Sequence, residues 1–132
     1  MVIDSSAVLA ILQNEPERRA FNEAIATADH CALTAASLVE LSIVIEARFG
    51  SDGQADLDLF LSTAQISIVS LDREQAEMAR AAFARYGKGR HRAGLNLGDC
   101  FSYALAQSLE QPLLFKGDDF SHTDLQPACP VT

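Results

Sequence analysis

The sequence predicts an α/β fold built on a central, mainly parallel sheet of four to five strands. Short apolar runs alternate along the chain with longer segments whose apolar residues recur every three or four positions. This alternation is typical of strands joined by crossover helices, which cover both faces of a parallel sheet. The length of 132 residues fits one domain, and 48% hydrophobic with 21% charged residues indicates a folded chain.

The first half of the chain is expected to contain two strands and three helices. The third helix, up to Phe49, is apolar nearly all round, which predicts that it is buried. Gly50 is expected to end it. The second helix is expected to start at Glu15, because Pro16 is allowed in a first turn. The predicted strands are Met1–Asp4 and Cys31–Thr34, and the helices follow Asp4, start at Glu15 and start at Ala35.

The second half repeats this alternation. The patterns predict, in order, a helix from Asp52 to Ala64, a strand at Ile66–Leu71, a helix after Asp72, a helix from Asn96 to about Glu110 and a strand at Pro112–Phe115. Asp72 is a cap, Gly87 a stop, and the apolar stripe between them consists of Ala76, Ala79, Phe83 and Tyr86. The tail after this strand is expected to be irregular or a short edge strand.

Charge and cysteine content restrict the setting of the protein. The net charge of -8 means that any affinity for nucleic acid must come from a local basic patch, a metal ion or a partner. Three dispersed cysteines without a CxxC spacing favour reduced thiols. The apolar runs are too short to cross a bilayer, and no secretory pattern opens the chain. We therefore expect a cytoplasmic protein with no membrane partner.

Several acidic residues lie at element boundaries, where each has an ordinary structural explanation. Asp4 can cap the first helix, and Asp99 can face the positive end of a helix dipole. Glu40 fits a capping box with Ser37, although its apolar helical neighbours also suggest a carboxylate on a buried stripe that needs a partner. Asp118 and Asp119 follow a strand as turn residues. These structural readings remain open for each acid taken alone.

Taken together, the acids suggest a shared site. Asp4 and the Asp118–Asp119 pair follow strands, Asp99 opens a helix, and Glu40 lies in the helix after the second strand. In a parallel sheet these places fall on the same edge, where ligands of α/β proteins bind. Four carboxylates together repel one another unless protons or a hard cation neutralise them. Oxygen ligands suit Mg²⁺ or Mn²⁺, and no His/Cys set suggests zinc.

Four motifs together resemble the PIN-domain nucleases, and most closely the VapC toxins of bacterial toxin–antitoxin pairs. They cover essentially the whole chain in the family's order: Val2-Ile3-Asp4-Ser5-Ser6-Ala7, Ala36-Ser37-Leu38-Val39-Glu40, Gly94-Leu95-Asn96-Leu97-Gly98-Asp99-Cys100 and Leu114-Phe115-Lys116-Gly117-Asp118-Asp119-Phe120. The resemblance implies a three-layer α/β/α PIN-like nuclease domain over residues 1–132. It also implies a catalytic quartet of Asp4, Glu40, Asp99 and Asp119, with Ser6 beside it. The doubled acid leaves Asp118 as an alternative to Asp119.

The resemblance further implies an Mg²⁺-dependent endoribonuclease, with Mn²⁺ as a possible substitute. Asp4 and Asp99 would bind the metal most directly, while Glu40 and Asp119 would hold waters or a second ion. Ser6 would orient a water or a phosphate oxygen. Such an ion lowers the pKa of a bound water for in-line attack on a phosphodiester. The products would carry a 5′-phosphate and a 3′-hydroxyl, and no catalytic histidine would be needed.

Two further features bear on this hypothesis. Lys88, Arg90 and Arg92 form the densest basic stretch and are candidate RNA contacts, the alternative being a solvated loop. The Cys100 thiol is expected to be structural rather than nucleophilic. VapC-like proteins commonly form homodimers and bind a VapB antitoxin, so these are the expected partners besides RNA. The competing hypotheses are a metal-dependent phosphohydrolase acting on another substrate and a non-catalytic interaction module.

Overall fold

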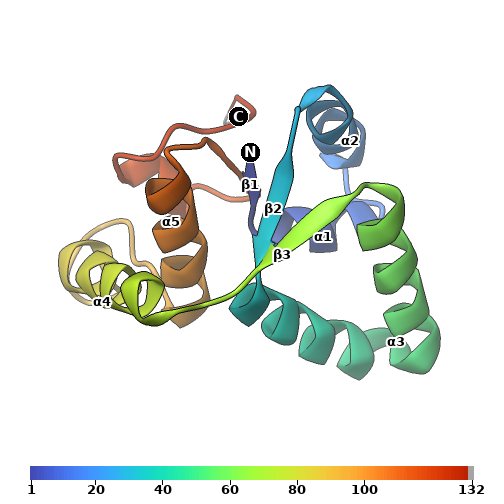
Figure 1. Ribbon diagram of the computed structural model, residues 1–132, viewed down its shortest axis with the longest axis horizontal. Helices are drawn as coiled ribbons and strands as arrows, with labels where there is room; N and C mark the ends of the chain where they lie inside the picture. The colour runs from blue at the N-terminus through green and yellow to red at the C-terminus, as the bar shows by residue number, and fades with distance from the viewer. Residues whose placement is uncertain (131–132) are drawn as a thin grey trace.

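Four parallel strands form the central sheet, in the order β3-β2-β1-β4 (Figure 1). The computed structural model describes residues 1–130, so the last two residues of the predicted 1–132 domain lie outside it. β2 has the bounds that the sequence predicted, whereas β1, β3 and β4 are shorter than predicted. α2 begins after the turn that holds Pro16 rather than at Glu15. The strands are β1 Val2–Ile3, β2 Cys31–Thr34, β3 Ile66–Val69 and β4 Leu113–Leu114.

Helices cover both faces of the sheet, which confirms the predicted three-layer architecture. Val2 belongs to the core shared with α4 and α5, while its neighbour Ile3 belongs to the core shared with α1, α2 and α3. Successive strand residues therefore bury into opposite layers, as the two-residue period of a strand requires. Figure 1 shows the two helical layers on either side of the strands. The helices are α1 Ser5–Leu12, α2 Arg18–Thr27, α3 Ala35–Thr63, α4 Arg73–Tyr86, α5 Leu97–Leu109 and the short 3₁₀ helix η1 Asp119–His122.

The chain after η1 returns to the sheet beside β4. Leu113 donates a backbone hydrogen bond to Gln126 (3.0 Å) and accepts one from Ala128 (2.8 Å), which makes a single parallel bridge to Pro127. This bridge is the short edge pairing that the sequence offered as one possibility for the tail. The pairing of β4 with β1 on its other side places the carboxyl end of β4 next to the end of β1, which Asp4 follows.

The first half of α3 corrects a prediction, because it is not buried all round. Leu41 and Ile45 are buried, but Val39 and Ile43 are 60% and 63% exposed. The apolar pattern could not identify the buried face because apolar residues lie on nearly every face of this helix. The sheet is also too short to cover a helix of this length, and α3 extends past the end of β2 (Figure 1). Gly50, at φ 65°, interrupts the helical geometry where the sequence predicted an end.

The buried face of α4 also differs from the predicted stripe. Asp72 caps the helix through its side chain and Gly87 follows its last residue, as expected. Ala79 and Tyr86 are buried, whereas Ala76 and Phe83 are exposed. Gln75 and Ala82 take their places on the inner face, which lies about 100° around the helix from the missed positions. Within residues 1–130, none of the helices has both the length and the apolar character that a bilayer crossing requires.

Candidate active site

Asp4 lies at the junction of β1 and α1, where it is both a helix cap and a buried acid. Its backbone N–H donates to the carbonyl of Leu114 in β4 (2.9 Å), and its Oδ2 accepts from the backbone N–H of Ser6 (3.0 Å). Its Oδ1 accepts a 2.5 Å hydrogen bond from the Ser102 hydroxyl on α5. The side chain is 3% exposed. The structural explanation as a cap is therefore correct, and it does not compete with a role at a site.

Asp99 lies in the first turn of α5, in a reciprocal capping box with Asn96. The Asn96 side chain accepts from the Asp99 backbone N–H (2.9 Å), and Asp99 Oδ2 accepts from the Asn96 N–H (3.1 Å). The pKa of Asp99 is raised to about 6, mainly by burial and in part by the negative charges of Asp4, Asp119 and Glu40, against the opposing effect of the backbone hydrogen bond from Asn96. The four acids that the sequence singled out are thus close enough to influence one another electrostatically.

Glu40 reaches this group from α3, but not in the way the sequence suggested. It is exposed, so the buried stripe predicted around it is wrong. Its capping box with Ser37 is wrong as well, because Thr34 caps α3. The Glu40 carboxylate accepts from the Ser5 hydroxyl (3.1 Å) and lies against Gly98, where an added Cβ would stand 2.7 Å from its Cδ. Glycine at position 98 therefore lets a carboxylate from α3 approach the start of α5.

The two acids after β4 differ in their surroundings. Asp119 is exposed at the start of η1, and its charge contributes to the raised pKa of Asp99. Asp118 precedes η1, and its carboxylate lies 3.9 Å from the His122 imidazole. Asp118 is not among the charges that act on Asp99. This geometry favours Asp119 over Asp118 as the fourth acid of the group.

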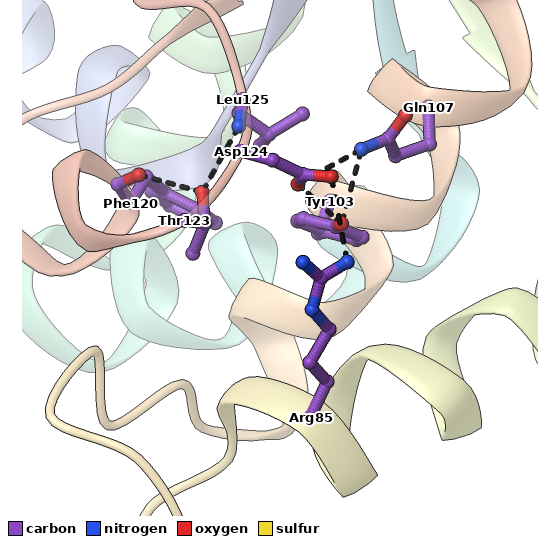
Figure 2. Close-up of polar contacts among 7 residues, drawn as sticks. All are labelled: Arg85, Tyr103, Gln107, Phe120, Thr123, Asp124 and Leu125. Atoms are coloured by element: carbon purple, nitrogen blue, oxygen red, sulfur yellow. Dashed lines mark hydrogen bonds and ion pairs between the residues drawn. The ribbon is translucent and has the colours of Figure 1, made fainter.

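A polar cluster on α4 and α5 fastens the segment that follows Asp119 (Figure 2). Asp124 accepts hydrogen bonds from the Tyr103 hydroxyl (2.5 Å) and the Gln107 amide (3.0 Å), and its other oxygen lies 3.6 Å from Arg85. Burial and the bond to Asp124 raise the pKa of Tyr103 above its ordinary value. Tyr103 therefore contributes to packing and to this polar cluster. Its hydroxyl donates to Asp124 rather than to one of the four acids of the candidate site.

Further hydrogen bonds and packing contacts hold the residues between this cluster and Asp119. The Thr123 hydroxyl donates to the carbonyl of Phe120 (2.6 Å) and accepts from the backbone N–H of Leu125 (3.2 Å), as Figure 2 shows. The Phe120 ring is buried and packs on Phe115 with a centroid separation of 5.2 Å. Although Asp119 itself is exposed, the backbone next to it is held by buried contacts.

Ser6 links α1 to the turn after β4. Its hydroxyl oxygen accepts from the Lys116 backbone N–H (3.0 Å), which leaves the hydroxyl proton free to donate. The Lys116 ammonium group contacts Glu15 and Glu17 instead of the acidic group. These contacts fix the turn that leads into Asp118 and Asp119.

The site also includes three serines whose roles were not predicted from the sequence. Ser5 holds Glu40, Ser102 holds Asp4, and Ser37 lies 3.4 Å from Ser102 through their hydroxyl oxygens. Ser102 could have attracted notice, because it is a polar residue within the apolar face of α5, one turn after Asp99. Its partner, however, lies almost a whole chain length away in sequence.

The Lys88–Arg92 loop lies outside the acidic group but leads into it. Lys88, Arg90 and Arg92 are exposed, and Leu95 closes the loop by backbone bonds to Lys88 and Tyr86 (both 2.9 Å). The Arg90 guanidinium lies 5.7 Å from the centroid of the Phe83 ring. Over residues 1–130, no ion pair joins the three cations to the four acids. The loop ends next to Asn96, the cap of the helix that carries Asp99.

The donor set fits a hard divalent cation. In the described part of the chain, no basic side chain pairs with Asp4, Glu40, Asp99 or Asp119. Asp4 uses two of the roughly four acceptor positions of a carboxylate, so it retains capacity for a metal. Oxygen donors of this kind suit Mg²⁺ or Mn²⁺. No three acids among residues 1–130 yet stand in a closed metal cage, so the exposed carboxylates would have to move inward.

The Cys100 thiol next to Asp99 is not suited to nucleophilic chemistry. Cys100 is buried, and burial together with the Asp99 charge raises the pKa of its thiol to about 11. Since the thiolate is the reactive form, this thiol is unreactive at neutral pH. The other polar side chains at the site are carboxylates and hydroxyls.

Comparisons with known proteins agree with the fold and with the resemblance to the PIN-domain family. A protein-family model described as "PIN domain" matches residues 1–125. Ribonuclease VapC30 of Mycobacterium tuberculosis is 56% identical over 126 residues, which is 95% of each chain. The crystal structure of Mycobacterium tuberculosis VapC20, described as a sarcin–ricin loop cleaving toxin, superposes with a TM-score of 0.73 at 14% identity, over 96% of this chain and 98% of that one. The VapBC2 structure from Rickettsia felis, bound to a promoter DNA fragment, gives a TM-score of 0.75 at 13% identity and covers 96% and 94%.

Proposed function

Because the chain belongs to the PIN-domain family and, within it, to the VapC ribonucleases, we propose that it is a divalent-cation-dependent endoribonuclease and the toxin of a toxin–antitoxin pair. The observation that carries this proposal is the group of Asp4, Glu40, Asp99 and Asp119. They come from four separate segments, and the charges of Asp4, Glu40 and Asp119 each help to raise the pKa of Asp99. None of the four has a basic partner among residues 1–130. Such uncompensated charge is expected at a cation site.

Asp4 and Asp99 are the residues proposed to hold Mg²⁺ or Mn²⁺, with Glu40 and Asp119 closing the site from its exposed side. When bound, such an ion offsets the charge of the scissile phosphate and increases the acidity of an attacking water. Asp4 supplies a carboxylate whose orientation two hydrogen bonds already fix. Ser6 retains a hydroxyl proton with which it can donate to a phosphate oxygen or a water. The products would carry a 5′-phosphate and a 3′-hydroxyl.

The Lys88–Arg92 loop is proposed to contact the RNA backbone. Its three cations are exposed, and the loop ends at the cap of the helix that carries Asp99. Replacing Lys88, Arg90 and Arg92 by glutamine should weaken RNA binding and reduce the slope of log affinity against log salt by up to about three. Fluorescence anisotropy in chelator with a labelled RNA measures this. The same changes at the distant exposed cations Arg19 and Arg73 are the control, and an unchanged slope in the loop variant would reject the contact.

The proposed partners follow from the relatives. A VapB-like antitoxin is proposed because a structural neighbour is a VapBC assembly, and a homodimer is proposed as the form that binds it. The proposed location is the cytoplasm, where the free thiols of Cys31, Cys100 and Cys129 would stay reduced. Light scattering of the chain, alone and co-expressed with the product of a neighbouring basic reading frame, tests both assembly proposals.

The decisive experiment incubates the purified chain with defined RNAs in Mg²⁺, in Mn²⁺ and in chelator. Cleavage in either metal that stops in chelator is expected, and mapping of fragment ends reports the 5′-phosphate. Asp4→Asn should be inactive, while Asp29→Asn, an exposed acid at the opposite end of the sheet, should cleave normally. Cleavage that continues in chelator would contradict the metal proposal. Hydrolysis of small phosphoesters without RNA cleavage would favour a phosphohydrolase, and no hydrolysis at all an interaction module.

A further inference from the structure

Three buried polar side chains form a hydrogen-bonded row in the core, and Asp4 of the acidic group is at one end of it. Ser37 of α3 and Ser102 of α5 are both 0% exposed, and Asp4 after β1 is 3% exposed. The Ser102 hydroxyl donates to Asp4 Oδ1 (2.5 Å), and the Ser37 and Ser102 hydroxyl oxygens lie 3.4 Å apart. This row of side chains connects α3 and α5, from the two helical layers, to the end of β1.

Counting the available protons shows which group donates and which accepts in each of these hydrogen bonds. A serine hydroxyl has one proton to donate, and Ser102 gives its proton to Asp4 because an ionised carboxylate only accepts. Ser37 must then be the donor to Ser102. Both hydroxyl dipoles point toward Asp4, an arrangement in which successive hydrogen bonds strengthen one another. The short Ser102–Asp4 distance is in the range of a charge-assisted O–H···O⁻ bond.

Packing alone does not account for a hydroxyl at position 102. Ala104 and Ala106 are 0% and 1% exposed, so the same helix buries small side chains without a hydroxyl at other positions. Burying a hydroxyl costs free energy unless it makes a hydrogen bond, and the bond that Ser102 donates goes to Asp4. The backbone N–H of Ser6 fixes the other oxygen. Together the two bonds determine the plane in which the Asp4 carboxylate lies.

We propose that Ser102 is a positioning residue that acts through Asp4, with Ser37 as its support. By fixing the carboxylate before an ion arrives, Ser102 removes the ordering cost that a freely rotating Asp4 would add to cation binding. This inference rests on the proposed function in one respect, namely that Asp4 is a cation ligand. Groups that orient metal ligands typically change metal affinity about 10- to 100-fold when they are removed.

Mn²⁺ binding to the full chain, measured by titration calorimetry without RNA, tests the proposal directly. Ser102→Ala should weaken binding about 10- to 100-fold, and Ser102→Cys, which keeps the shape but donates only weakly, should come close to it. Ser37→Ala should have a smaller effect of the same sign. Cys31→Ala is the matched control, because it shortens a buried side chain at the amino end of β2, whereas Asp4 lies at the carboxyl edge of the sheet. It should lower thermal stability and leave Mn²⁺ affinity unchanged.

A second readout separates positioning from a purely structural role. In RNA cleavage, the Mn²⁺ concentration for half-maximal rate should rise in Ser102→Ala, and the rate at saturating Mn²⁺ should return near that of the unaltered chain. Ser102→Ala that melts at a lower temperature but binds Mn²⁺ as tightly as the unaltered chain would overturn the proposal. If the unaltered chain binds Mn²⁺ through Asp4 but cleaves no RNA, the proposed function fails and the role of Ser102 stands. No Mn²⁺ binding by the unaltered chain overturns both.

Discussion

The acidic group has two halves that are built differently. Asp4 is buried with both carboxylate oxygens bonded, and Asp99 is half-buried in a capping box. Glu40 and Asp119 are exposed, and the one side-chain bond described for Glu40 comes from Ser5. One half is therefore set by the core before any ligand arrives, while the other half can adjust to it.

The difference between the two halves explains how a small fold can bring four negative charges together at an acceptable cost in free energy. The buried half follows from elements that form for other reasons, because Asp4 and Asp99 both belong to the starts of helices. The exposed half remains in water, where repulsion between carboxylates is screened. If all four acids were buried without a cation, the cost in free energy would be far greater. The predictions below test whether this division into a fixed half and an adjustable half is correct.

The largest effect is expected from the fixed half. Asp4→Asn keeps a side chain that caps helices well, so the fold should be retained, but it removes the charge of a proposed cation ligand. Since loss of an orienting group already costs about 10- to 100-fold, loss of the ligand should reduce the cleavage rate more than about 100-fold. Initial rates on a defined RNA in Mg²⁺ measure this. A rate within tenfold of the unaltered chain would show that Asp4 is only a cap.

Changes in the adjustable half should cost less. Glu40→Gln and Asp119→Asn should each reduce the rate about 10- to 100-fold, with part of the loss recovered at high Mn²⁺. Asp118→Asn is the matched control for the second change, because its carboxylate is turned toward His122. The same rate assay decides the comparison. If Glu40→Gln is as inactive as Asp4→Asn, the two halves do not differ in function.

The third prediction concerns stability without metal. The pKa of Asp99 is about 6 in the folded chain, against an ordinary value of 3.8. The unfolded chain therefore loses this proton first, and the stability contributed by protonated Asp99, fully present below about pH 4, is lost as the pH rises through 6. At pH 7 in chelator, Asp99→Asn should be more stable than the unaltered chain by about 1–2 kcal/mol, after allowance for solvent screening.

Urea unfolding in chelator at pH 4 and at pH 7 measures this difference. The two chains should have similar stability at pH 4, where Asp99 is protonated in the folded state. Mg²⁺ at pH 7 should stabilise the unaltered chain and leave the Asp99→Asn variant almost unchanged. Equal stability of the two chains at pH 7 in chelator would mean that burial and the neighbouring charges do not disfavour the ionised form of Asp99.

The smallest effect is expected at the contact between the two halves. In Gly98→Ala the new Cβ would displace the exposed Glu40 carboxylate, while alanine favours the helix by about 0.5–1 kcal/mol. Thermal stability should stay level or rise slightly, and the cleavage rate should fall by no more than about tenfold. Adding Gly98→Ala to Glu40→Gln should then have little further effect. A large additional loss in the double variant would show that position 98 acts in another way.

The sequence was sufficient for the layer order and for the meeting of the acids, because strand ends in a parallel sheet share an edge. Asp4 after β1 and Asp119 after β4 follow from that rule alone. It was insufficient for α3, where an all-apolar pattern does not indicate which face the short sheet covers. Glu40 was wrongly expected on a buried stripe for this reason. The Ser102–Asp4 bond could not be predicted, because a serine carries no local indication of a partner so distant in sequence.

The pairing of β1 with β4 has a consequence for the order in which the chain is made. Asp4 is translated well before β4, which pairs with β1, and before the 3₁₀ helix that carries Asp119. A growing chain thus exposes Asp4 long before its partners exist. The complete acidic group therefore forms only after β4 and η1 have been made.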